Sequence, residues 1–157
     1  MERGASLRLL ERYDEAAASY RLALEHARRP EIFLNLAESE LANGHREAAI
    51  LALLPAVRFD VTLLMEPEVA SIRGDVWRRL TANFDERRIS NAYVDLILTL
   101  FAQGRYSEAY TLFADAASRY PALATRTEFQ SYGSDVTGDM IKTLANWKRR
   151  SERPTFF

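Results

Sequence analysis

The sequence predicts an all-α protein made of consecutive helical hairpins, and three observations support this fold class. The chain has 157 residues, of which 48% are hydrophobic and 27% charged, a composition typical of a globular protein with a core. Apolar residues recur along it at steps of three and four, as on one face of a helix. Small residues also recur at fixed offsets among large ones. In residues 101–121 the series is Gly104, Tyr106, Ala109, Phe113, Ala116 and Pro121.

The same spacing occurs twice more, nearer the N-terminus. The matching residues are Tyr13, Ala16, Tyr20 and Ala23 in the first copy, and Gly44, Arg46, Ala49, Leu53 and Ala56 in the second. Alanines on one face of a helix allow a second helix to approach closely, and the aromatic residues fill the space beside that contact. The glycine before the series suits the turn at the end of a helix, where φ is often positive. In the first copy Glu11 replaces this glycine.

A further apolar stripe precedes the second and third turns. It consists of Phe33, Leu36, Ala37 and Leu41 before Gly44, and of Tyr93, Leu96, Ile97 and Leu100 before Gly104. Each unit is therefore predicted to be a helix, a tight turn and a second helix. We expect a single domain over 1–150, with repeat units at about 1–30, 31–63 and 90–123.

Residues 61–89 do not fit this repeat. Val69, Ile72, Val76, Leu80 and Phe84 form a three-four stripe, and Pro67 suits a first helical position. The pattern predicts one irregular helix over 66–84, and a helix pair with its turn at Gly74 is the alternative. Farther along, the sequence predicts a capping helix over 135–150 that covers the last repeat, followed by a flexible tail over 151–157. The whole array would have about seven or eight helices.

These phased stripes resemble the tetratricopeptide repeat (TPR) family, in a degenerate bacterial form, over residues 4–60 and 90–123. The resemblance implies an α-solenoid that acts as a non-catalytic scaffold or adaptor and holds a partner peptide or helix on its concave face. The implied groove residues are Glu31, Leu34, Glu38 and Leu41 in the second unit, and Asn91, Val94, Leu98 and Phe101 in the third. This apolar and acidic surface suits an amphipathic or basic partner segment. The alternative is that Leu98 and Phe101 are covered by the next helix of the chain.

A second interpretation places the chain in a larger assembly. Residues 29–60 are also similar to TPR regions that follow the membrane portion of bacterial envelope-glycan polymerases and ligases. On that view the chain is a soluble appendage or subunit of a membrane-associated complex, at the membrane or in the periplasm and not in the cytoplasm as the first interpretation expects. Self-association remains open. The formal net charge of −1 gives no reason to expect nucleic acid as a partner.

The residue types needed for catalysis do not come together in the sequence. There is no cysteine, and the two histidines, His26 and His45, lie in different units, so we interpret them as surface residues at helix ends. We find no HExxH, phosphate-binding loop or GxSxG motif. We therefore expect no enzyme activity, cofactor or metal. Lys148, Arg149 and Arg150 are interpreted as cations at a helix C-terminus, with contact to lipid or other phosphates as the alternative.

Overall fold

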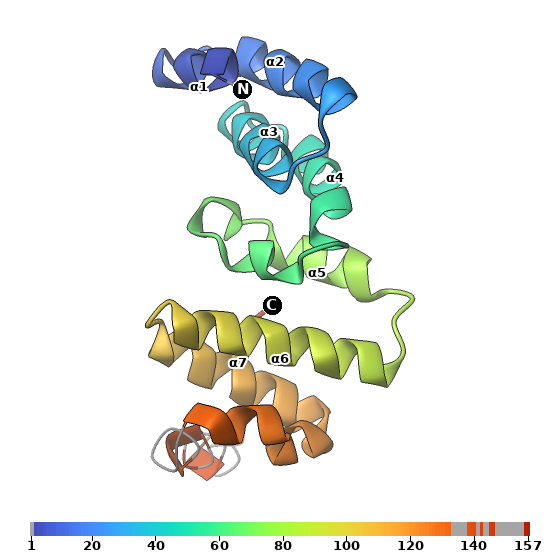
Figure 1. The fold of residues 1–157 in the computed structure, drawn as a ribbon, viewed down its shortest axis with the longest axis vertical. Helices are drawn as coiled ribbons and strands as arrows, with labels where there is room; N and C mark the ends of the chain where they lie inside the picture. Colours follow the sequence, from blue (N-terminus) through green and yellow to red (C-terminus); the bar gives the residue numbers. More distant parts are fainter. Residues whose placement is uncertain (1, 133–137, 141, 143–144, 147–155) are drawn as a thin grey trace. The chain divides into compact units, whose positions relative to one another are not determined.

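The protein is all-α, as the sequence predicts. The computed structural model describes residues 2–132, 138–140, 142, 145–146 and 156–157, and these residues form helices and turns without a strand (Figure 1). The chain divides into two compact units, Met1–Ala82 and Asn83–Phe157, where the sequence led us to expect a single domain over 1–150. Each unit is described by itself below.

The first unit begins with two helical hairpins. Its first four helices are α1 (Glu2–Leu9), α2 (Tyr13–His26), α3 (Pro30–Ala42) and α4 (Arg46–Val57). Each helix packs against the next in the chain. Gly4 lies where α1 meets α2, and a Cβ atom added there would come within 2.6 Å of the Tyr20 ring. The close approach of α1 to α2 therefore depends on the small residue at this position.

The second unit contains the third hairpin. This hairpin is formed by α6 (Glu86–Ala102) and α7 (Tyr106–Arg119). The short 3-10 helices η3 (Pro121–Thr125) and η4 (Thr127–Tyr132) follow it. The side chain of Asp85 caps α6 by accepting a hydrogen bond from the Arg88 N–H at 2.8 Å. Because of this cap, α6 starts before residue 90, where we expected the repeat unit to begin. The Phe113 and Phe129 rings meet edge to face at 5.5 Å, so η4 packs on α7.

All three hairpins turn in the same way. Glu11, Gly44 and Gly104 have positive φ angles of 57°, 77° and 71°. In each turn the next residue donates its backbone N–H to the carbonyl five positions earlier, from Arg12 to Leu7, from His45 to Glu40 and from Arg105 to Leu100, at 2.8–2.9 Å. This is the pattern of a helix that ends with a left-handed residue. Glu11 thus occupies the position where the other two turns have glycine.

The recurring alanines lie in the contacts between helices. Ala16, Ala49 and Ala109, which follow the three turns at the same offset, are completely buried. Ala56 and Ala116, seven positions after the second and third of these alanines, are also buried. The prediction that these residues face neighbouring helices is confirmed.

The segment after α4 differs from the expected single helix over 66–84. It contains η1 (Val61–Met65), η2 (Pro67–Val69) and α5 (Arg73–Thr81), with a turn between η2 and α5. The predicted stripe is nevertheless buried from Val69 to Leu80, because a 3-10 turn followed by an α-helix preserves the three-four spacing. The α-helix itself begins only at Arg73, whose side chain donates to the Leu64 carbonyl at 2.5 Å. Gly74 lies inside α5 and does not form the alternative turn.

Most of the predicted capping helix over 135–150 lies outside the described residues. Residues 138–140, 142 and 145–146 are helical, and Met140 is buried. Of the tail predicted to be flexible, only residues 156–157 are described. Both are half-buried, and the Phe157 ring lies 6.1 Å from the Tyr93 ring, so the end of the chain packs against α6 within the second unit.

Candidate functional site

The four residues predicted on the second repeat unit lie along one side of α3. Glu31, Leu34, Glu38 and Leu41 follow one another at steps of three and four, which places them on one face of the helix. Glu31 is exposed, and the other three are half-buried. This surface, which we call the α3 face, therefore presents two partly accessible leucines beside two carboxylates.

The carboxylate of Glu38 is already paired within the chain. It accepts a salt bridge from Arg8 of α1, and the same guanidinium donates to the Asn35 side-chain oxygen at 2.7 Å. Burial raises the pKa of Glu38, Arg8 opposes this rise, and the nearby carboxylate of Glu68 adds to it. The α3 face thus carries two carboxylates, of which Glu38 pairs with Arg8 and Glu31 with Arg29, and Glu68 adds a third negative charge nearby.

The residues predicted on the third unit do not form a comparable surface on α6. Asn91 is exposed, and its side-chain oxygen accepts a hydrogen bond from Arg126 at 3.0 Å. Leu98 is half-buried, whereas Val94 and Phe101 are buried. The prediction that all four residues line an open groove is therefore corrected for Val94 and Phe101.

The physical reason for the burial of Phe101 is its contact with α7. Its ring lies 6.0 Å from that of Tyr106 and 5.8 Å from that of Tyr110. Aromatic rings at these separations attract one another in tilted and edge-on arrangements. The alternative interpretation, that the next helix covers this residue, holds for Phe101.

The sequence also drew attention to basic residues near the C-terminus and to the two histidines. Lys148, Arg149 and Arg150 lie outside the described residues. His26 and His45 are both exposed at helix ends, as expected. The His45 Nδ1 atom lies 3.1 Å from a carboxylate oxygen of the buried Glu40. Within the described part of the chain, no group of three or more histidine, cysteine or acidic residues could hold a metal ion.

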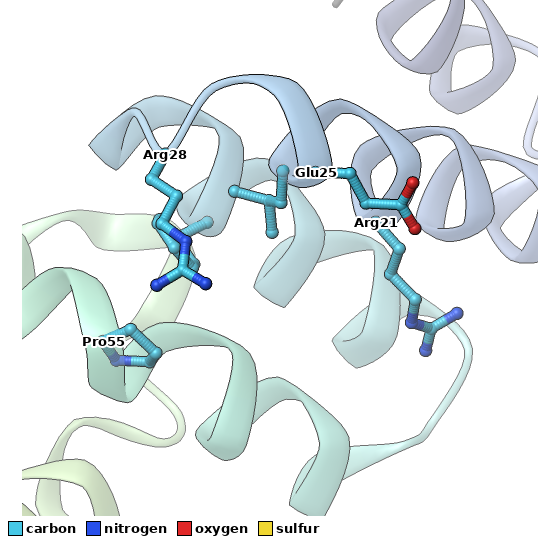
Figure 2. A pocket seen from close by; sticks show the side chains of 6 residues that line it. Arg21, Glu25, Arg28 and Pro55 are labelled. Carbon is cyan, nitrogen blue, oxygen red and sulfur yellow. The ribbon is translucent and has the colours of Figure 1, made fainter.

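The structure also contains a hollow that the sequence analysis did not anticipate (Figure 2). It lies between α2, α3 and α4 and has a volume of about 320 Å³. Its lining residues are Arg21, Leu24, Glu25, Arg28, Phe33 and Pro55. The signal in the sequence was a second stripe on α2, with Arg21, Leu24 and Glu25 at steps of three and four, followed by Arg28 in the linker to α3. We call this feature the α2–α4 hollow.

None of the described helices is long and apolar enough to cross a membrane. Comparison of the chain with protein-family models, with curated proteins and with solved structures found no match.

Proposed function

We propose that this chain is a TPR-like helical-repeat module without catalytic activity, and that its α3 face binds a basic or amphipathic segment of a partner protein. The partner segment would place apolar side chains against Leu34 and Leu41 and a cation near Glu31. The role is that of a scaffold or adaptor.

The repeated turn geometry is the observation that carries this proposal. Three hairpins end their first helix with a left-handed residue, make the same hydrogen bond across the turn, and bury an alanine at the same offset. A repeated unit of this kind holds side chains at regular intervals on a firm backbone and creates an extended binding surface. In the first unit two such hairpins follow directly, and α2 packs against α3.

The carboxylates of the α3 face favour a partner segment that is positively charged. Glu38 accepts the guanidinium of Arg8, so the chain itself provides an example of how a cation binds there. Glu31 is exposed, and its salt bridge with Arg29 spans 3.6 Å between nitrogen and oxygen. A surface ion pair of this kind contributes little, so a partner cation can replace Arg29 at small cost.

Affinity capture with a matched pair of variants tests the proposal. The source organism's proteins are captured on the wild-type chain, on Leu34→Asp and on Leu22→Asp, which changes an exposed leucine of α2 (56% exposed) away from the α3 face. The proposal expects a protein that the wild type and Leu22→Asp retain and Leu34→Asp loses. Circular dichroism must show the same helicity for all three chains.

The captured protein is then purified and titrated calorimetrically. Binding that is equally strong for Leu34→Asp and the wild type would place the contact elsewhere and refute the role of the α3 face. Turnover of a substrate by the wild-type chain would contradict the non-catalytic assignment.

A further inference from the structure

The α2–α4 hollow has an apolar floor and a charged rim. Leu24 and Phe33 are half-buried, whereas Arg21, Glu25, Arg28 and Pro55 are exposed. Its volume of about 320 Å³ lies at the lower end of the roughly 300–1,000 Å³ of ligand pockets. Because most of its lining is exposed, the hollow is open to solvent. These features fit one or two inserted side chains of a protein segment better than an enclosed small molecule.

Exposed apolar residues continue the floor of the hollow along α4. Leu51, one helical turn before Pro55, is 55% exposed, and Phe59, just past the end of α4, is 94% exposed. Steps of four residues keep Leu51 and Pro55 on one side of the helix. Neighbouring apolar side chains that remain exposed beside a hollow are typical of a protein interaction site.

The guanidinium at the Pro55 end of the hollow is that of Arg28, and Arg58 follows Pro55 by three residues in the sequence. Arg21 is paired with the buried Glu40. Among the described residues, Arg28 and Arg58 have no hydrogen-bond or ion-pair partner, and both are exposed. The one unpaired carboxylate of the lining is that of Glu25. Figure 2 shows the Glu25 carboxylate turned away from the Arg28 guanidinium, which lies toward Pro55.

We propose that the α2–α4 hollow is a second docking site, which binds an acidic protein segment that carries a single large apolar side chain. That side chain rests on Leu24, Phe33 and Pro55, and a neighbouring carboxylate pairs with the Arg28 guanidinium. A bidentate arginine–carboxylate pair fixes the orientation of the bound segment and also attracts it. The site differs from the α3 face in the charge of the partner that it selects.

A peptide titration followed by nuclear magnetic resonance tests the proposal on the full chain. The probes are nonapeptides of aspartate and glutamate with one central leucine, phenylalanine or tryptophan, and matched peptides with lysine at every acidic position. We expect the acidic peptides to shift the amide signals of Leu24 on α2 and Leu51 on α4, and the lysine peptides to leave these two signals in place. Equal shifts with both sets, or shifts confined to other residues, would overturn the proposal.

Variants then identify the contacts. Arg28→Glu is expected to weaken the binding of the best acidic peptide about tenfold, which corresponds to about 1.4 kcal/mol. Pro55→Glu places a carboxylate on the floor and should weaken binding as strongly. It also removes a proline from a helix, which favours folding, so a loss of binding cannot be attributed to unfolding.

The control for charge reversal is Arg87→Glu on α6, which changes an exposed arginine that has no partner among the described residues. This variant should bind the acidic peptide as the wild type does. Equal affinities of Arg28→Glu and Arg87→Glu would refute the assigned contact. Leu34→Asp, which tests the α3 face, must also leave acidic-peptide binding unchanged, so a failure of either site is distinguishable from a failure of the other.

Discussion

The three helical hairpins and the segment 61–82 bury similar apolar stripes but hold their backbones in place differently. In the hairpins, fully buried alanines such as Ala49 and Ala109 lie at the helix contacts. In the segment, no repeated alanine series is present, and arginine side chains hold the elements together. Hydrophobic periodicity thus predicts which residues are buried, whereas small residues and polar contacts decide the backbone path.

The arginine contacts of the segment fall into two kinds. Arg73 is buried and donates its Nε–H to the Leu64 carbonyl at 2.5 Å, which connects α5 to η1. Exposed ion pairs connect α5 to α4, from Arg46 to Asp75 at 2.5 Å and from Arg79 to Glu47 at 2.7 Å. A buried hydrogen bond contributes more than exposed ion pairs, which water and salt screen.

The largest expected effect comes from an enlarged alanine in a hairpin. Ala109→Leu adds three carbon atoms to a site without exposed surface and should lower the free energy of unfolding by about 3 kcal/mol, because overpacking forces the helices apart. The matched variant Ala70→Leu, in the exposed turn before α5, should leave stability nearly unchanged. Urea unfolding measures both. Equal effects of the two substitutions would show that the alanines do not distinguish the hairpins from the segment.

The second-largest expected effect on stability comes from substitution of the buried Arg73. Arg73→Met keeps the apolar stem but leaves the Leu64 carbonyl without this donor, and should lower the free energy of unfolding by about 2 kcal/mol. Arg79→Met removes an exposed pair with Glu47 and the nearby attraction to Asp75, and should change stability little. The Arg79 effect should also disappear in high salt. A larger loss for Arg79→Met than for Arg73→Met would mean that the surface network, not the buried bond, holds the segment.

The smallest effects concern the left-handed residue of each hairpin. Gly104→Ala should destabilise the second unit by about 1 kcal/mol, because a side chain is disfavoured at a positive φ. No atom lies within 4 Å of the added Cβ, so the cost comes from the backbone alone. Conversely, Glu11→Gly should stabilise the first unit by about 0.5 kcal/mol. Glycine removes the strain of a side chain at positive φ, and this gain exceeds the cost of the larger conformational entropy that glycine gives the unfolded chain. Thermal unfolding measures the two changes, and opposite signs are the expected result.

The candidate sites show what a residue pattern within one helix can predict about exposure and what it cannot. The resemblance to the TPR family implied a shared face for Leu34 and Glu38, and these two residues lie on one face of α3. The same resemblance placed Phe101 in the groove, with cover by the next helix as the alternative, and the rings of Tyr106 and Tyr110 lie beside it. A single-helix pattern identifies a face, but it does not reveal which neighbour covers that face.

The amino-acid sequence by itself determined the all-α class, the three tight turns and the burial of the alanines, because these depend on residues that are close together in the chain. Only the tertiary structure decided the division into two units, the path of residues 61–82 and the α2–α4 hollow. Those features depend on contacts that reach beyond one helix, as when the Arg73 side chain donates to the Leu64 carbonyl and when Arg28 and Pro55 line one hollow. Such contacts depend on packing in three dimensions, which helical spacing alone does not specify.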